Sequence, residues 1–232
     1  GVPDLPNRIN RRTAAALTAP HSKAGLTSAR RDALGATDPT HDGSVRLRPP
    51  PGLSAHTNAG SVNLSEIASV LGEVSVPERA FLDGLTFEGT IRATLLVENL
   101  GAWRDLPAPT GWLLVHVPGW DTATVGHLLD RLSDVPIIHF GDIDPNGVRI
   151  LLHLRRRVPG LHWFLPDFWF ELAETTGLRA KWPSDLDLGF APKRVRRLAA
   201  QDLWLEQERI VVDPRIGGAL EAVVAENDAS PA

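Results

Sequence analysis

Three short apolar runs constrain the fold of this chain more than any other feature of its sequence. They span residues 92–98, 112–117 and 135–140, and residues 161–165 offer a fourth. Unbroken runs of this length are typical of strands that are buried on both faces, as in parallel sheets. Apolar residues recur at helical spacing over 122–133 and 145–154, and Asp144 and Pro145 suit the start of the second helix. The order predicts an α/β fold with an open, mostly parallel sheet flanked by helices.

The first sixty residues have a different composition. Only nine of them are Val, Ile, Leu, Phe or Trp, a share of about 15%, which is too low for most chains to fold alone. This stretch carries eight basic and four acidic residues, and Pro49-Pro50-Pro51-Gly52 marks a stiff connection. We therefore expect a basic arm or linker at 1–60, small and helical, winged-helix-like or poorly ordered. A short helical connector at 61–89, with a helix near 65–71, would precede the main domain at 90–232.

Residue types that are absent exclude several classes of protein. The 232 residues include no Cys, which excludes disulfides, thiolate nucleophiles, iron–sulfur clusters and cysteine zinc sites. They include no Tyr, which excludes a tyrosine nucleophile for DNA strand transfer. They include no Met, so we expect a processed chain or a fragment. A net charge of −4 and the lack of a long apolar run predict a cytoplasmic protein that does not enter a membrane.

Acidic residues follow two of the predicted strands. Glu98 follows the first apolar run, and Asp142 and Asp144 follow the third. Because ligands of open α/β sheets bind at the carboxyl ends of the strands, these side chains are expected to converge. Asp142 and Asp144 are two residues apart and would point the same way on an extended segment. Three converging carboxylates raise one another's pKa unless a divalent cation neutralises them, so the sequence predicts a Mg²⁺ or Mn²⁺ site.

Acids in these positions also occur in sites of other kinds. An aspartate before a helix is often only an N-cap, which applies to Asp144, and a pair of loop aspartates is usually solvated. A strand that ends in Asp also occurs in P-loop ATPases, but the sequence has no Gly-x-x-x-x-Gly-Lys-Ser/Thr segment to hold phosphates. A phosphoacceptor receiver domain would need aspartates on its first and third strands and a later lysine, which is a different set.

Three separated motifs carry a family resemblance. Glu98 after one apolar strand and Asp142-x-Asp144 after another resemble the Toprim fold of primases, topoisomerases and related nucleases. More closely, residues 97–100, 140–147 and 205–210 resemble the C-terminal domain of JetD, the nuclease subunit of Wadjet plasmid-defence systems. The resemblance covers residues 90–213.

The resemblance implies metal-dependent hydrolysis of double-stranded DNA. It implies that Glu98 binds metal or acts as a general acid or base and that Asp142 and Asp144 are metal ligands. Gly147 would be the small residue that lets the following helix approach the sheet. Asn99, Glu206 and Glu208 would position the acids without binding the metal themselves. With no Tyr in the chain, water would be the nucleophile and no protein–DNA adduct would form.

Basic, aromatic and histidine residues are further candidates. One predicted helix contains four basic residues within five positions, and these are the expected contacts to DNA phosphates: Lys193, Arg194, Arg196 and Arg197. The three arginines at 155–157 instead suit a helix C-terminus.

The aromatic residues of 163–170 are interpreted as core. His139 precedes the acidic loop, and Asp167 follows the fourth strand as a more distant acid. A helix is predicted over 199–209.

Two functions follow from these observations. The first is a metal-dependent DNA endonuclease of a JetD-like defence system against plasmids or other foreign DNA. The alternative is a non-catalytic Toprim-like DNA-binding or assembly subunit of an SMC-like complex. The expected partners are double-stranded DNA, an SMC-like ATPase complex and a second copy of the chain.

Overall fold

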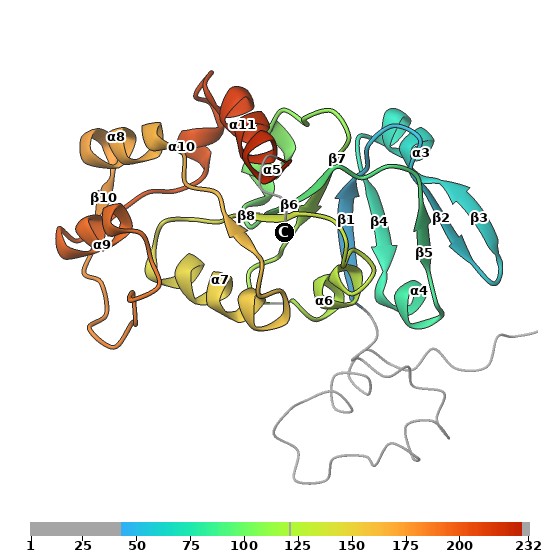
Figure 1. The fold of residues 1–232 in the computed structure, drawn as a ribbon, viewed down its shortest axis with the longest axis horizontal. Coiled ribbons are helices and arrows are strands. Elements are labelled where there is room, and N and C mark those ends of the chain that lie inside the picture. Colours follow the sequence, from blue (N-terminus) through green and yellow to red (C-terminus); the bar gives the residue numbers. More distant parts are fainter. Residues whose placement is uncertain (1–42, 121, 229–232) are drawn as a thin grey trace, which may run out of the picture. The chain divides into compact units, whose positions relative to one another are not determined.

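The computed structural model describes residues 43–120 and 122–228, which belong to one compact unit, Gly43–Ala232 (Figure 1). Most of the arm expected at 1–60 therefore lies outside the described residues. Within them, six strands form a central sheet in the order β4-β1-β7-β6-β8-β9. These strands are β1 Ser44–Arg48, β4 Val74–Pro77, β6 Ala93–Val97, β7 Trp112–His116, β8 Ile137–Phe140 and β9 His162–Trp163.

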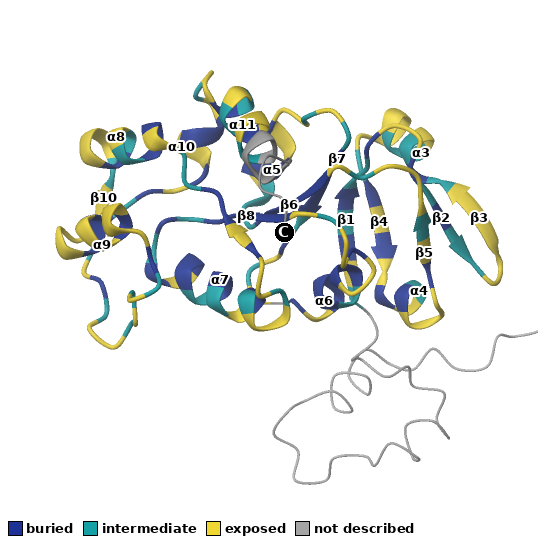
Figure 2. Ribbon diagram, in the orientation of Figure 1, coloured by how far each residue is buried: buried dark blue, intermediate teal, exposed yellow. Residues whose placement is uncertain are grey.

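The centre of this sheet is parallel. β6 pairs with β7 on one side and with β8 on the other, and β8 pairs with β9. Every residue of β6 and β8 is buried, as Figure 2 shows for the middle of the sheet. Burial on both faces explains why these segments read as continuous apolar runs. The predicted α/β class, with a mixed and mostly parallel sheet flanked by helices, is confirmed.

The helices between the parallel strands cover both faces. α5 (Leu100–Asp105) connects β6 to β7, α6 (Ala123–Leu129) connects β7 to β8, and α7 (Pro145–Arg157) connects β8 to β9. Figure 1 shows α6 and α7 on one side of the sheet and α5 on the other. The chain thus leaves β6 and β8 in opposite directions across the sheet. The carboxyl ends of these two strands flank a topological switch point, where open α/β sheets bind ligands.

The edge of the sheet beside β7 is antiparallel. β1 pairs with β7 and with β4, and its Val45 and Leu47 are buried while the residues between them are less so. We expected a boundary between arm and domain near Pro49 and Gly52. The structure differs, because β1 precedes these residues and is already part of the central sheet.

The segment expected to be a short helical connector contains strands as well. A three-stranded antiparallel sheet has the order β3-β2-β5, formed by β2 Ser54–Thr57, β3 Gly60–Asn63 and β5 Thr86–Glu88. The helices here are α3 Leu64–Leu71 and α4 Glu78–Leu82. The Asn63 side chain caps α3 by accepting a hydrogen bond from the Glu66 amide at 3.1 Å. α3 matches the helix expected near 65–71.

The chain after β9 contains α8 Asp167–Thr176, β10 Leu178–Arg179, α9 Lys193–Ala200, β11 Leu203–Trp204, α10 Glu208–Val211 and α11 Ile216–Asp228. The helix predicted over 199–209 is wrong. α9 ends at Ala200, Asp202 has a positive φ of 54° that no helix accommodates, and β11 pairs with β10. The segment between β11 and α10 is therefore free to run beside the acidic loop.

Aromatic side chains from β8, from α8 and from the segment between β9 and α8 form a core cluster. The Phe140 ring lies 5.5 Å from that of Phe164 and 5.3 Å from that of Trp169, measured between centroids. All three side chains are buried. The interpretation of this aromatic group as core, rather than as a platform for bases, agrees with their burial.

Candidate active site

Glu98 and the acidic loop meet because β6 and β8 are neighbours. Val97 is opposite Phe140 in the parallel register, and the Glu98 amide donates to the Phe140 carbonyl at 3.3 Å. Both strands then end at the same edge of the sheet, at the switch point. The structure thus brings the acid that follows β6 beside the loop that holds Asp142 and Asp144, as the sequence predicts.

The two aspartates of the loop are held by backbone amides. Asp142 Oδ1 accepts a hydrogen bond from the Gln207 amide at 2.8 Å, and Asp144 Oδ1 accepts one from the Gly147 amide at 2.6 Å. Asp144 is the N-cap of α7, with Pro145 at the first helical position, so the capping interpretation describes its geometry correctly. These hydrogen bonds fix the direction of each carboxylate.

Burial and crowding make the charges of this loop unfavourable. Burial, together with the charges of Glu98, Asp144 and Glu208, raises the pKa of Asp142 to about 7, against the opposing hydrogen bond from Gln207. Burial and Glu98 also raise the pKa of Asp144. No cationic side chain is among the groups that shift either pKa. The loop is a cluster of anionic groups without a counter-charge, which is the environment that a bound cation would relieve.

Whether these residues fit a metal ion depends on chemistry and placement. In the part of the chain that the structure describes, no three His, Asp or Glu side chains are arranged to hold one ion. The residue types nevertheless suit Mg²⁺ or Mn²⁺, because carboxylate oxygens are the ligands that hard cations take. Glu98, Asp142 and Asp144 are the residues that would hold it.

His139 is fully buried beneath Glu98. Its Nε2 lies 2.9 Å from Glu98 Oε1, although the two atoms do not have the angles of a hydrogen bond. Gly141 leaves the space for this contact, because a Cβ there would overlap the Glu98 carboxylate and lie 2.5 Å from His139 Cε1. His139, a candidate because it precedes the acidic loop, thus lies beside Glu98. Gly141 is a residue that the sequence did not single out.

Gln207 connects the three segments of the site and was not predicted as one of its residues. Its side chain accepts from the Asn99 amide at 2.7 Å and donates to the Phe140 carbonyl, and its own amide donates to Asp142. The residue is fully buried. A bridge between Ile143 and Leu205 fixes the two chain segments side by side. The sequence offered one signal for Gln207, its position between Glu206 and Glu208. The charges of these two neighbours suggested a solvated helix face instead of a buried site.

The other residues predicted to support the acids have distinct positions. Asn99 caps α5 by accepting from the Ala102 amide at 3.0 Å, and its Nδ2 donates to Glu208. Glu206 is exposed and its side chain makes no hydrogen bond or ion pair within the described residues, although its charge contributes to the raised pKa of Asp144. Gly147 is required by space, because a Cβ would overlap the Asp142 carbonyl oxygen.

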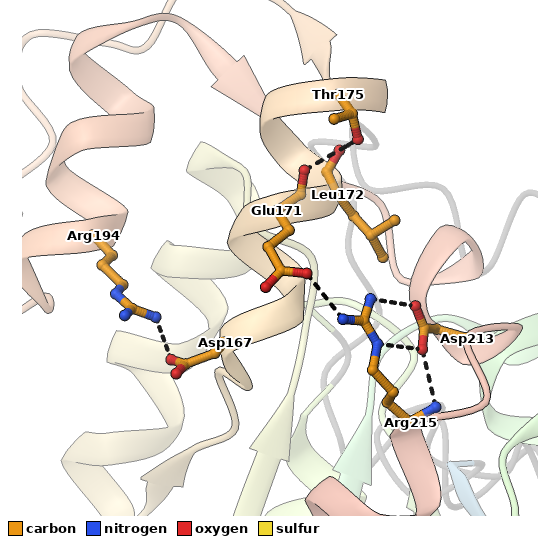
Figure 3. A network of polar contacts seen from close by, with 7 residues as sticks. All are labelled: Asp167, Glu171, Leu172, Thr175, Arg194, Asp213 and Arg215. Atoms are coloured by element: carbon orange, nitrogen blue, oxygen red, sulfur yellow. Dashed lines mark hydrogen bonds and ion pairs between the residues drawn. The ribbon is translucent and has the colours of Figure 1, made fainter.

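The predicted DNA-binding residues lie on α9, and two of them already have acidic partners. Arg194 forms an ion pair with Asp167, and Arg197 Nη2 lies 3.2 Å from Glu174 Oε1. Figure 3 shows Asp167 turned toward Arg194 across the gap between α8 and α9. Lys193 and Arg196 are exposed and show no ion pair within residues 43–120 and 122–228. Asp167, expected as a more distant acid of the site, instead serves this pairing.

Two of the three arginines at the end of α7 have structural partners. Arg155 donates to the Leu161 carbonyl, and Arg157 forms an ion pair with Asp130. These contacts agree with their interpretation as helix-terminal residues. Among the described residues, no helix is long and apolar enough to cross a membrane.

Fold and site together define an α/β domain with an acidic loop at its switch point. Residues 63–168 match the family described as Wadjet protein JetD, C-terminal. The predicted resemblance to that domain is confirmed over this segment, which contains Glu98, Asp142 and Asp144. The match begins before the expected residue 90 and ends before the segment that holds Gln207. None of the curated proteins matches the chain.

Proposed function

We propose that this chain is a divalent-metal-dependent DNA endonuclease that acts in a JetD-like plasmid-defence system. The observation that supports the proposal most directly is that Glu98, Asp142 and Asp144 lie near one another in a partly buried, strongly acidic environment at the switch point of the sheet. Although Asp144 caps α7, the crowding of like charges opposes folding, so a ligand is the simplest reason for it. The similarity of this segment to the JetD C-terminal domain supports the same reaction class.

The side chains have separable roles in this proposal. Asp142 and Asp144 would hold the ion through carboxylate oxygens, and the Gln207 and Gly147 amides fix the direction of each carboxylate. Glu98 supplies a further oxygen or moves a proton at the scissile phosphate. A divalent ion bound there would polarise the phosphate and lower the pKa of a water molecule. With no Tyr in the sequence, the cut ends carry no protein.

Metal binding can be tested without any assumption about DNA. Calorimetric titration of the chain with Mn²⁺ should show binding, and Asp142→Asn should lose most of it. Asp105→Asn is the matched control, because Asp105 is an exposed aspartate at the end of α5. Identical isotherms for the wild type and Asp142→Asn would refute the metal site.

Cleavage is the test of the proposed reaction. Supercoiled plasmid should be nicked or linearised in Mg²⁺ or Mn²⁺, by the chain alone or with its cognate SMC-like complex, and should stay intact in EDTA. Glu98→Gln and Asp142→Asn should abolish cleavage with the fold retained, and Asp105→Asn should cut like the wild type. Variants that cut at the wild-type rate would place the activity elsewhere.

One observation favours a second candidate, a non-catalytic DNA-binding or assembly subunit of an SMC-like complex. No three acidic side chains among the described residues surround one point, and Asp144 already has a capping role. This candidate predicts that plasmid survives in every divalent metal, even with the complete complex present. It also predicts that the Glu98 and Asp142 variants still assemble with the SMC-like partner.

A further inference from the structure

Trp120 differs from every other tryptophan in the chain. Its exposed fraction is 54%, whereas those of Trp103, Trp112, Trp163, Trp169 and Trp182 are at most 7%, and Trp204 is half-buried. An indole in contact with water forgoes the burial that makes this side chain favourable in a core, so exposure at this level suggests a binding role. Trp120 follows β7, at the same edge of the sheet as Glu98 and Asp142.

The exposed indole is held in place. Trp120 Nε1 donates a hydrogen bond to Asn146 Oδ1 at 2.8 Å, and the ring meets His153 edge to face with centroids 6.2 Å apart. Both partners belong to α7, the helix that begins at the acidic loop. A ring fixed by two contacts loses little further conformational freedom when a ligand binds to it.

The same contacts connect Trp120 to the acidic loop. The Asn146 side chain holds the indole, and the Asn146 backbone amide donates to the Asp144 carboxylate. Asn146 thus contacts both the Trp120 ring and Asp144, which is a candidate metal ligand. Whatever group rests on Trp120 therefore lies at the rim of the candidate active site.

The surrounding chemistry limits what this group is. Glu98, Asp142 and Asp144 repel phosphate, so a contact that holds nucleic acid near them cannot depend on charge alone. An indole face offers stacking, which every nucleobase accepts regardless of sequence. Bases within a regular duplex are already stacked on their neighbours, so only an unstacked base is available to the ring.

We infer that Trp120 stacks on an unstacked nucleobase of the DNA beside the cleavage site. The inference rests on the proposed function, because it takes DNA as the ligand of the acidic loop. It assigns to Trp120 a positioning role: the ring binds DNA that is locally unpaired or distorted and so directs which phosphate lies over the acidic loop. The chain should therefore prefer such DNA to a regular duplex.

Binding in EDTA tests this inference without catalysis. Anisotropy titrations would compare a fluorescent duplex with the same duplex carrying a single-base bulge. The wild type should bind the bulged duplex more tightly, and Trp120→Ala should lower that affinity by about tenfold, as loss of one base–aromatic stack does, while changing regular-duplex affinity little. Trp120→Phe should retain most of the preference. Leu71→Ala in α3, whose side chain is 71% exposed, is the control for loss of an exposed apolar side chain elsewhere in the chain.

A second readout reports on the ring itself. Trp120 is the tryptophan most open to solvent, so acrylamide should quench the wild type more than Trp120→Phe. Bulged DNA should protect this accessible fraction. The inference fails if Trp120→Ala retains the preference, if both duplexes lose affinity equally, if the wild type binds neither DNA, or if the variant loses only an SMC-like partner. If the wild type prefers the bulged duplex and Trp120→Ala loses that preference, but no metal-dependent cleavage occurs, only the nuclease proposal is refuted.

Discussion

Asp142 is the residue whose charge its surroundings favour least. It is largely buried, accepts one hydrogen bond from the Gln207 amide and faces other acids, which raises its pKa to about 7. A carboxyl group with a raised pKa in the folded state stabilises the fold only while it is protonated. Above pH 7 the ionised group opposes folding in the absence of metal. A site that costs stability until its ligand arrives is typical of function.

Asp142→Asn should therefore stabilise the metal-free chain in alkaline solution. The folded pKa of about 7 exceeds the unfolded value of 3.8, so the protonated carboxyl stabilises below pH 3.8 and this contribution is lost as the pH rises through 7. A shift of this size corresponds to at most about 4 kcal/mol. Urea denaturation in EDTA should show the variant more stable at pH 8 by up to that amount, and less so at pH 5.

The control for this experiment is Asp105→Asn, an exposed substitution of the same chemistry. Its effect on the unfolding free energy should be within about 0.5 kcal/mol at both pH values. A destabilised Asp142→Asn chain at pH 8 would contradict the account of the loop as an uncompensated anionic cluster. Added Mn²⁺ should stabilise the wild type and not the variant.

Gly141 should be intolerant of even one methyl group. A Cβ at this position would overlap the Glu98 carboxylate and lie 2.5 Å from His139 Cε1, and both side chains are buried. Gly141→Ala should destabilise the chain by about 1–3 kcal/mol and displace Glu98 from the switch point. Thermal unfolding and Mn²⁺ titration measure the two effects. Gly160→Ala, where no atom lies within 4 Å of the added carbon, should change neither.

At the scale of elements, the sequence predicted the parallel strands and missed the segment that braces them. β6, β7 and β8 are buried on both faces, so their apolar runs were unambiguous. Leu203 and Leu205 suit a helix and a strand equally well, and the pairings that decide between them are with β10 and with Ile143. Contacts between residues about sixty positions apart leave no local pattern, so Gln207 could not be identified from its neighbours.

Gln207→Ala should uncouple these elements. The substitution leaves the Asn99 amide without its buried acceptor, at about 1–3 kcal/mol, and removes one of the two donors to the Phe140 carbonyl, at about 1 kcal/mol, since the Glu98 amide still donates to it. We expect a loss of about 2–4 kcal/mol in the unfolding free energy, and faster hydrogen exchange at the Asn99 amide. Gln201→Ala is the matched control, because Gln201 is exposed at the end of α9. Unchanged exchange at Asn99 would contradict the bracing role.

At the scale of the whole molecule, composition misplaced the start of the domain. β1 lies in a stretch with few large apolar residues, yet Val45 and Leu47 are enough to bury one face of an antiparallel strand beside β7. A strand that is buried on one face needs an apolar residue only at every second position. Val45 and Leu47 alone therefore give a weak signal for a strand within a basic stretch. The position of Glu98, Asp142 and Asp144 at the carboxyl ends of β6 and β8 was easier to predict, because these residues come directly after the strongest strands.

The distribution of charge over the molecule yields the last prediction. Arg194 and Arg197 of α9 are neutralised by Asp167 and Glu174, so DNA would have to displace a carboxylate before either contacts phosphate. Lys193 and Arg196 have no such partner within the described residues. Replacing these two together with Gln should lower the slope of log affinity against log salt by about two, at roughly 0.9 for each lost phosphate contact.

The matched control is the pair Arg194→Gln and Arg197→Gln, which removes the same charge from the same helix. Because each of these arginines leaves an unpaired acid behind, overall duplex affinity should fall while the salt slope changes by less than about one. Anisotropy titrations of a regular duplex from about 50 to 300 mM NaCl measure both slopes, because added salt screens exposed charges increasingly strongly over this range. EDTA prevents cleavage during the titration. Equal slopes for the two double variants would show that the ion pairs between α8 and α9 open on binding. A slope unchanged by Lys193→Gln with Arg196→Gln would place the phosphate contacts away from α9.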